Sequence, residues 1–402
     1  MKRLVFTKYE GSIVCVLFDG NLPVEINIES AQRPGLLGNI YTGKVKDVKK
    51  NINAAFVDIG MEKNCYYSLE DNSFPIYTHG SEKEFPVSGD EIIVQISKEA
   101  VKTKPPSLSS TLKFSGRYVL IETGKNSFGV SHKIDDENRK RLYELFSPLR
   151  LENTSVIIRT NAKDARDEEI YAEIRHFNNI ITEELPRWKT RKACSVLMKN
   201  EPYYIGVLRE FSAEDFDEIV TDDTEILSEI EDFMLEYFPL DKDKLKYYAD
   251  KTFSLSNLYG IKSTLTGALA KKVWLKSGAY LVIEMTEALC VIDINTGKKI
   301  SSKDKESNIL EVNKEAAYEI IRQLRLRNIS GMIIADFIDM KSEESKEELL
   351  SYLKNLASAD KTGVKIHGFT TLGLVEMTRK KVRMSLYEQY KNAYNEINQK
   401  SG

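Results

Sequence analysis

Two aspartates and one asparagine near the ends of apolar segments are the residues of this sequence best suited to chemistry. Asp293 and Asn295 stand in ALCVIDINTGKK (288–299), where the apolar residues predict a strand. Side chains of a strand alternate between its faces, so Asp293 and Asn295 lie on one side, one pleat apart. A carboxylate and an amide beside a buried sheet need partners that satisfy them.

A third polar residue, Asp336, stands in a second apolar segment, GMIIADFIDM, which we expect to be a buried strand. The amphipathic stretch 307–327 between the two segments predicts a helix. Such a crossover makes the two strands parallel and usually neighbours. Open α/β sheets bind ligands at the carboxyl ends of their strands. We therefore expect Asp293 and Asp336 to lie close in space, with Asp339 just beyond.

Carboxylates gathered without basic neighbours repel one another, and a hard divalent cation relieves that repulsion. Mg²⁺ prefers oxygen ligands, takes one or two carboxylates and keeps several waters. It activates water and neutralises charge on a phosphodiester. The alternative interpretation is that Asp293 and Asn295 only cap a turn at Thr296 and Gly297. The residues by themselves leave both interpretations open.

The composition is that of an ordinary globular protein and sets limits on the partners. The 402 residues are 42% hydrophobic and 30% charged, with a net charge of −3. This charge balance argues against a surface that is basic throughout, so binding of a nucleic acid would need local basic grooves. We find no apolar run near the roughly 18 residues of a membrane span and no signal peptide. We expect a cytoplasmic protein.

Cysteine and histidine are too scattered to predict a zinc site or a disulfide framework. The chain has four of each, and no cysteine pair forms C-x-x-C. The cysteines are Cys15, Cys65, Cys194 and Cys290, and the histidines are His79, His132, His176 and His367.

Strand and helix patterns divide the chain into five segments and predict a multi-domain α/β protein. Residues 1–35 alternate apolar and polar residues and are expected to join a sheet completed later in the chain. Residues 36–116 carry short strands between Gly- and Asn-rich turns, which predicts a small barrel, with an OB fold as candidate. Residues 117–205 read as α+β, 206–272 as mixed, and 273–402 as strands and helices around the two aspartates.

Three local expectations concern helices near the end of the chain. NLYGIKSTLTGALAKKVWL is expected to contain a helix. Ser345 and Glu348 could form a capping box at the start of SKEELLSYLKNLA. EMTRKKVRMSLYEQYKNAYNEINQ is expected to be a basic helix.

Several long motifs resemble the catalytic core of the ribonuclease E/G family. They are KKVWLKSGAYLVIEMTEALCVIDINTG, EIIRQLRLRNISGMIIADFIDM and LGLVEMTRKK, and GNIYTGKVKDVKKNINAAFVDIG resembles the family's OB module. The resemblance covers essentially the whole chain in the right order. It implies an Mg²⁺-dependent, single-strand-specific endoribonuclease of RNA processing and decay. It also implies an RNase H-like subdomain split over 1–35 and 206–272, the OB module (36–116), a 5′-sensor subdomain (117–205) and a DNase I-like catalytic subdomain (273–402).

The resemblance assigns roles to the polar residues near the strand ends. Asp293 and Asp336 correspond to ligands of Mg²⁺, or of Mn²⁺ in its place, and Asn295 to the residue that orients the water or the scissile phosphate. Asp339 and Lys298 correspond to neighbours of this site.

Three positions of the OB module correspond to RNA-binding residues of the family. Phe56 and Tyr66 match an aromatic platform, and a base stacked on such a ring contributes roughly 1–3 kcal/mol. Lys104 matches a lysine that reaches RNA near the active site. Two alternatives stay open: Phe56 as a core residue, and the lysines of KVKDVKK (44–50) as a solvated edge.

A 5′-phosphate pocket is implied by VIIRTNAKDA and by a turn upstream of it. Arg159 offers a planar fork for phosphate oxygens and Thr160 offers a hydroxyl donor. Gly116 and Leu120 match further pocket positions. A second arginine of the family pocket has no evident counterpart, because glycine and lysine stand at 363 and 365. The preference for 5′-monophosphorylated RNA therefore rests on fewer residues than cleavage does.

The sequence departs from the family where a zinc link joins two protomers. MTRKKVRMSLYEQYKNAYNEINQKSG contains no cysteine, so zinc is not expected and the choice between homodimer and homotetramer is open. The chain resembles the compact ribonuclease G type, with mRNA, rRNA or tRNA precursors as partners. A non-catalytic RNA-binding protein using the OB module and a DNA nuclease are the alternatives, and the intact trio of Asp293, Asn295 and Asp336 favours an RNA-cleaving enzyme.

Overall fold

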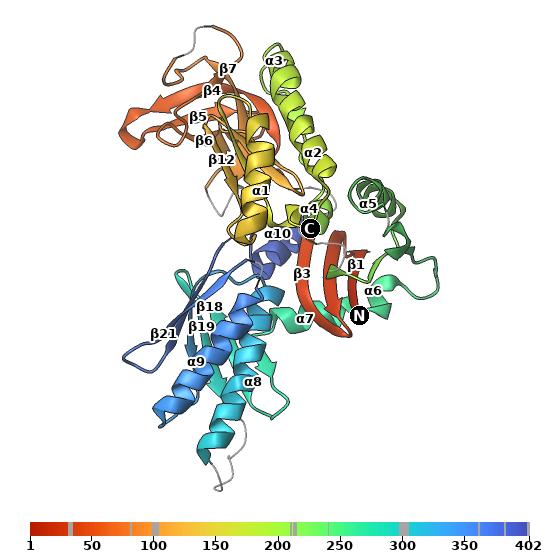
Figure 1. Ribbon diagram of the computed structural model, residues 1–402, viewed down its shortest axis with the longest axis vertical. Coiled ribbons are helices and arrows are strands. Elements are labelled where there is room, and N and C mark those ends of the chain that lie inside the picture. Colours follow the sequence, from red (N-terminus) through yellow and green to blue (C-terminus); the bar gives the residue numbers. More distant parts are fainter. Residues whose placement is uncertain are drawn as a thin grey trace. The chain divides into compact units, whose positions relative to one another are not determined.

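A computed structural model gives the fold as two compact units (Figure 1). It describes residues 1–30, 35–80, 83–98, 104–209, 211, 215–239, 241–296, 305–360, 362–381 and 383–399. One unit is the continuous segment Pro34–Ser212. The other combines Met1–Arg33 with Ala213–Gly402, so the chain leaves this unit and later returns to it.

The continuous unit contains a closed five-stranded barrel in the order β4-β5-β6-β9-β8, with β8 returning to β4. The strands are β4 Ile40–Lys49, β5 Ala54–Asp58, β6 Cys65–Ser68, β8 Glu91–Lys98 and β9 Ser107–Ser109. Alternate side chains such as Val57 and Tyr67 fill the barrel interior. Gly43 is needed there, since a Cβ at this position would lie 2.5 Å from a methyl carbon of Val57. The prediction of a small OB-like barrel is confirmed.

A second sheet of the same unit has the order β10-β11-β13-β12. Its strands are β10 Lys113–Ser115, β11 Val119–Thr123, β13 Thr154–Ile158 and β12 Ser127–Val130. Helices α1 Asp136–Phe146 and α2 Asp167–Asn179 accompany it, and α2 continues through a π-helical turn, Ile180–Glu184, into α3 Leu185–Trp188. The α+β character expected for this region is confirmed.

In the discontinuous unit, the N-terminal strands join strands from much later in the chain. The sheet order is β16-β15-β1-β2-β3, and β1 runs parallel to β15. The strands are β1 Lys2–Tyr9, β2 Ser12–Asp19, β3 Leu22–Ser30, β15 Glu218–Thr221 and β16 Leu245–Tyr247. The expectation that residues 1–35 complete a later sheet is confirmed.

The second sheet of this unit carries the two aspartates and has the order β17-β18-β19-β20-β22-β21. Its strands are β17 Lys272–Trp274, β18 Tyr280–Met285, β19 Leu289–Asn295, β20 Gly331–Asp336, β22 Val375–Arg379 and β21 Val364–Phe369. The crossover helix α8 Lys305–Leu326 and helix α9 Glu343–Ser358 run side by side (Figure 1). One face of the sheet forms a core with these helices.

The other face of this sheet is open, as the alternation of burial along β19 indicates. Cys290, Ile292 and Ile294 are buried, whereas Val291 and Asp293 are exposed. On β20, Ile333 and Ala335 are buried and Met332 is exposed, so the expectation of a fully buried strand is wrong. The polar residues of interest therefore lie on the open face.

Of the three helix expectations, one is confirmed and two need correction. The helix expected in the segment 257–275 is α7 Ile261–Leu269, and Lys272–Trp274 of the same segment is a strand. The cap of α9 is Ser342, whose hydroxyl accepts a hydrogen bond from the Ser345 N–H, so the expected capping box at Ser345 is wrong. The helix begins three residues earlier than expected, because Ser342 caps it, and Glu343 and Glu344 in its first turn suit the positive end of the helix dipole.

The expected basic helix at the end of the chain is a strand followed by a separate helix. β22 uses the alternation of buried Val375, Met377 and Arg379, which the neighbouring lysines obscure in the sequence. Helix α10 Leu386–Gln399 carries both acidic and basic residues and is not basic. It packs against β3, and Gln389 Oε1 accepts a hydrogen bond of 2.8 Å from the Ile28 N–H.

None of the helices in the described ranges is long and apolar enough to cross a membrane.

Candidate functional site

Asp293 and Asp336 are direct neighbours across two parallel strands. They are register partners on β19 and β20, and adjacent strands lie about 4.8 Å apart. Ile292 and Ile294 on either side of Asp293 are buried against the helices, which holds the Asp293 side chain on the open face. The predicted crossover thus brings the two carboxylates together.

The Asn295 amide is held by the neighbouring carboxylate. Asn295 Nδ2 donates a hydrogen bond of 2.6 Å to Asp293 Oδ2. Asn295 lies one pleat beyond Asp293 on the same face, as the strand pattern predicts. The interpretation that these two residues only cap a turn does not account for their position inside a hydrogen-bonded strand.

Negative charge accumulates around Asp336. Partial burial, followed by the charges of Asp293 and Asp339, raises the pKa of the Asp336 carboxyl. Each of these effects disfavours the ionised form, and a bound cation would counteract both. The electrostatics of the pair therefore fit a cation site.

The donor set fits a hydrated magnesium ion better than a cage of protein ligands. In the part of the chain that the structure describes, no group of three or more His, Cys, Asp or Glu side chains is arranged to hold a metal. Asp293 and Asp336 therefore stand as a pair, without Asp339 as a third ligand. Mg²⁺ commonly takes one or two carboxylates and completes its shell with water. Lys298 lies outside the described residues.

The loop after Asp336 is fixed by a buried asparagine that the sequence analysis did not single out. Asn313 on α8 is 0% exposed. Its Nδ2 donates to the Ile338 carbonyl at 2.8 Å, and its Oδ1 accepts from the Ile338 N–H at 3.1 Å. A polar residue on the apolar stripe of the predicted helix was the available signal, since a buried amide needs specific partners.

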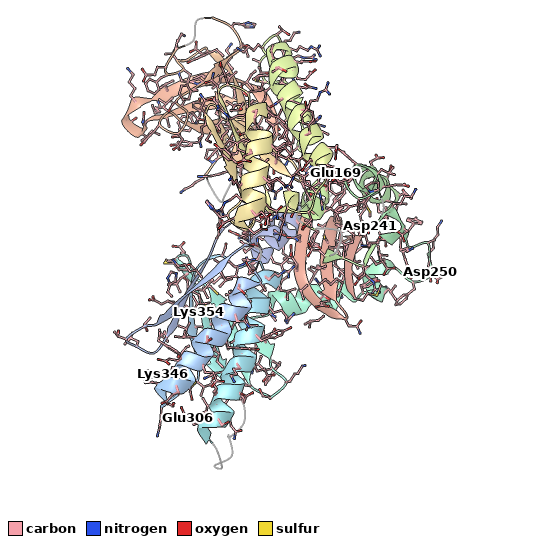
Figure 2. The ribbon with its side chains drawn as sticks, in the orientation of Figure 1. Glu169, Asp241, Asp250, Glu306, Lys346 and Lys354 are labelled. Atoms are coloured by element: carbon pink, nitrogen blue, oxygen red, sulfur yellow. The ribbon has the colours of Figure 1, made fainter. Side chains whose placement is uncertain are left out.

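A second support of the same loop comes from the start of α8. Glu306 Oε1 accepts hydrogen bonds from the Lys341 and Ser342 N–H groups at 2.8 and 3.0 Å. Figure 2 shows Glu306 and Lys346 at the same end of the helix pair α8 and α9, with Lys354 further along α9. The crossover helix thus contacts the loop of Asp339 at both Asn313 and Glu306.

On the barrel, Phe56 and Tyr66 form an outward-facing aromatic pair. They are register partners on β5 and β6, with ring centroids 6.4 Å apart and planes at 79°. Both rings are half-buried, whereas the adjacent Val57 and Tyr67 fill the interior. The alternative that Phe56 is a core residue is wrong.

The lysines of the barrel region differ in whether a carboxylate pairs with them. Lys46 pairs with Asp58 at 3.2 Å and Lys49 with Asp47 at 2.7 Å, which reduces their use for phosphate. Lys104 is exposed and precedes the segment that pairs with β6, where the Tyr66 N–H donates to the Pro106 carbonyl at 2.9 Å. Of these three lysines, Lys104 is thus the one without an ion pair to a described residue.

The residues expected for a 5′-phosphate pocket come together at one end of the second sheet. Arg159 Nη1 donates to the Gly116 carbonyl at 2.6 Å. Leu120 follows the same turn and pairs with Ile157, two residues before Arg159. Thr160 is exposed, and its hydroxyl lies 2.9 Å from that of Ser131.

Gly116 makes room for a buried carboxylate that the sequence analysis did not single out. Glu173 on α2 accepts hydrogen bonds from the N–H groups of Arg117, Tyr118 and Val119 at 2.7, 2.7 and 2.8 Å. A Cβ at Gly116 would lie 2.2 Å from the Glu173 carboxyl carbon. A second guanidinium is near, since Arg209 Nη1 donates to the Ser115 carbonyl at 2.6 Å. The turn is therefore held by α2 and by two arginines.

Comparison with known proteins identifies the family. A profile of the Ribonuclease E/G family matches residues 113–382. Ribonuclease G of Escherichia coli (strain K12) is 34% identical over 383 residues, which cover 92% of this chain and 77% of that protein.

This chain belongs to the ribonuclease E/G family.

Other members show the same relationship. Ribonuclease G of Haemophilus influenzae is 34% identical over 373 residues, covering 90% of this chain and 76% of that protein. Ribonuclease E of Synechocystis sp. is 32% identical over 361 residues, covering 88% of this chain and 53% of that protein. The resemblance drawn from the sequence motifs is confirmed, and the chain spans a larger share of these ribonuclease G relatives than of this ribonuclease E.

As a member of the ribonuclease E/G family, this chain has its predicted site residues in three groups. The carboxylate pair lies on the open face of the second sheet of the discontinuous unit. The aromatic pair and the Arg159 pocket both belong to the continuous unit, on different sheets. Positions 363 and 365, where a second pocket arginine was sought, belong to the discontinuous unit.

Proposed function

We propose that this chain is an Mg²⁺-dependent endoribonuclease that cuts single-stranded RNA in RNA processing and decay. The observation that carries the proposal is the register pairing of Asp293 with Asp336 in a chain related to proteins named ribonuclease G and ribonuclease E. Paired carboxylates on an open face are accessible to an extended polymer.

In the proposed site, Asp293 and Asp336 would hold the ion, with Mn²⁺ as a substitute. A bound Mg²⁺ activates water and neutralises charge on a phosphodiester. Asn295 keeps the Asp293 carboxylate oriented through its 2.6 Å hydrogen bond, and its remaining polar atoms can orient the water or the scissile phosphate. The Asn313 clamp keeps the loop after Asp336 in place.

We propose that the barrel holds the RNA by stacking and charge. Phe56 and Tyr66 present ring surface beside each other, and stacking accepts any base. Lys104 supplies a phosphate contact. A duplex keeps its bases paired and cannot stack them on the rings in this way, which supports the proposed preference for single-stranded RNA.

A preference for a 5′ monophosphate is a further part of the proposal. Arg159 and Thr160 supply donors at the end of β13, next to the Gly116 turn and Leu120. Arg159 Nη1 donates to the Gly116 carbonyl, which holds the guanidinium group beside the Gly116 turn.

We also propose the family's subdomain names for the sheets described above. The sheet that joins residues 1–35 to 206–272 would be RNase H-like, and the barrel region, 36–116, would be the OB module. The sheet in 117–205 would be the 5′ sensor, and 273–402 would be DNase I-like.

A cleavage assay tests the proposal against its alternatives. A short AU-rich single-stranded RNA, the same sequence as duplex RNA and as single-stranded DNA are incubated with Mg²⁺ or with EDTA. Internal cuts only in the single-stranded RNA, and only with Mg²⁺, support the proposal. Tight binding of the RNA without cuts in Mg²⁺ or Mn²⁺ would instead identify a non-catalytic RNA-binding protein, and cuts in DNA would identify a DNA nuclease.

A further inference from the structure

An exposed tryptophan shares the open sheet face with the carboxylate pair. On this sheet, Trp274 is the register partner of Tyr280, and Tyr280 is the register partner of Asn295. These three residues form one row of register partners across the strands. The next such row consists of Lys272, Val282, Asp293 and Asp336. Two adjacent rows thus connect the edge strand β17 directly to the proposed active site.

The burial pattern places both rows on the face away from the helices. Leu281 and Ile283 of β18 are buried in the core with α8, whereas Tyr280 and Val282 alternate with them on the opposite side. Trp274 is 64% exposed. Register partners project to the same side of a sheet, so Trp274, Tyr280 and Asn295 share one face.

Lys272, Trp274 and Tyr280 form a compact cationic and aromatic cluster. The two ring centroids lie 5.1 Å apart. Lys272 Nζ lies 4.0 Å from the Trp274 ring centroid and 3.5 Å from that of Tyr280. The lysine is thus held by cation–π contacts with both rings, and most of the indole stays accessible.

We propose that this cluster is a stacking subsite for an RNA base close to the scissile phosphate. The inference rests on the proposed function, because it assigns the subsite to the same substrate strand. β17 lies two strand spacings from β19, about 10 Å, which is on the scale of one to two nucleotides of an extended strand. A base stacks on the exposed face of Trp274, and Lys272 meets the adjoining phosphate.

The occupant is single-stranded RNA because the cluster joins two features that such a strand uses. Aromatic faces stack on bases of any sequence, and a lysine beside them contacts the backbone. The same strand must reach Asp293 and Asp336 to be cut, and the rows across the sheet place the cluster on that route. An edge lysine also discourages pairing with other strands, which is the competing structural role of Lys272.

Intrinsic fluorescence provides a test that does not depend on cleavage. The chain has two tryptophans, and Trp188 is 7% exposed whereas Trp274 is 64% exposed. In a Trp188→Phe variant kept in EDTA, the remaining emission comes from Trp274. A short single-stranded RNA should quench it, whereas inorganic polyphosphate of similar charge should not. Absence of quenching by RNA, or equal quenching by polyphosphate, would overturn the subsite.

Steady-state kinetics provide the second arm. Trp274→Leu removes the ring but keeps an apolar side chain, and it should raise KM about 5- to 100-fold with kcat nearly unchanged, because stacking acts on bound substrate and transition state alike. Trp274→Phe should keep most of the affinity. Tyr318→Ala is the matched control, since Tyr318 is 50% exposed on α8, the helix that covers the opposite face of the sheet.

The two arms separate the inference from the proposed function. Wild-type cleavage with an unchanged KM in Trp274→Leu would overturn the subsite and leave the nuclease assignment intact. Quenching of Trp274 by RNA in a chain that never cleaves would support the subsite and refute the nuclease. If Trp274→Leu does not fold, as its melting curve would show, the fluorescence of the Trp188→Phe protein decides.

Discussion

The side-chain amide of Asn313 holds the backbone of Ile338 through two hydrogen bonds, one donated and one accepted. Asn313 is fully buried in the middle of the crossover helix, and Ile338 lies two residues past Asp336. The helix that connects the two aspartate strands therefore also fixes the loop that follows the second aspartate.

Asn313→Ala should destabilise the protein and slow cleavage together. It leaves the Ile338 N–H and carbonyl without partners, at a cost of about 1–3 kcal/mol. The free energy of unfolding in urea should fall by that amount, and kcat should fall while RNA affinity is retained. Asn355→Ala, at an exposed position on α9, is the control and should change neither quantity. Unchanged stability in Asn313→Ala would mean that the clamp contributes nothing.

Asp293→Asn and Asp336→Asn should each abolish cleavage while leaving RNA affinity nearly unchanged. In the proposed site, the lost carboxylates hold the ion, and the ion stabilises the transition state rather than the bound substrate. Cleavage rates and filter-binding affinities measure the two effects separately. EDTA should have the same consequence in the unmutated enzyme, with recovery on adding Mg²⁺ or Mn²⁺. Residual cleavage above about a tenth of the wild-type rate in both variants would contradict the assignment.

Phe56→Ala should weaken RNA binding by about 1–3 kcal/mol with little loss of stability, because the ring is half-buried on the outside of the barrel. Tyr67→Ala is the informative contrast, since Tyr67 is fully buried next to the platform residue Tyr66 and should mainly lower the melting temperature. A Phe56→Ala protein that melts early but binds RNA normally would show that the ring serves packing alone.

Arg159→Ala should remove any difference in cleavage rate between a 5′-monophosphate RNA and its 5′-hydroxyl counterpart, and leave the slower rate intact. The terminal phosphate only positions the substrate, whereas the carboxylate pair supports the chemistry. Arg159→Lys should restore little of this rate difference, because a lysine cannot present two parallel donors. If the unmutated enzyme cuts both RNAs equally fast, the pocket has no sensing role in this chain.

Gly116→Ala should destabilise the continuous unit, because the new methyl group would overlap the Glu173 carboxyl group. Inserting a carbon into a filled site typically costs about 1–3 kcal/mol. Thermal melting of the variant measures the loss. Gly129→Ala is the control, since a Cβ there meets no atom within 4 Å. Equal melting temperatures for the two variants would show that the Glu173 side chain can move aside at little cost in stability.

The strand–helix–strand pattern of β19, α8 and β20 predicted that Asp293 and Asp336 lie close together, and their register pairing confirms it. A strand–helix–strand crossover admits few arrangements, so Asp293 and Asp336 could be paired from sequence. The roles of Asn313 and Glu306 could not be predicted from the sequence. Both side chains form hydrogen bonds with backbone groups of the 338–342 loop, which come near only after α8 has packed. Glu173 could not be predicted for the same reason. Its partners are three N–H groups of the turn at 117–119, which are far from Glu173 in sequence and meet it only once α2 has packed. β22 was missed because the charges after it outweighed a short alternation of apolar residues.

The discontinuous unit has a consequence for protein synthesis on the ribosome. β1–β3 emerge first, but their partner strand β15 follows only after the whole segment 34–212 has been translated. Helix α10, which packs on β3, emerges later still. The barrel unit is continuous and can fold while the sheet of Asp293 and Asp336 is still being made. With the functions proposed for the barrel and for the carboxylate pair, a growing chain would hold RNA before it could cut it.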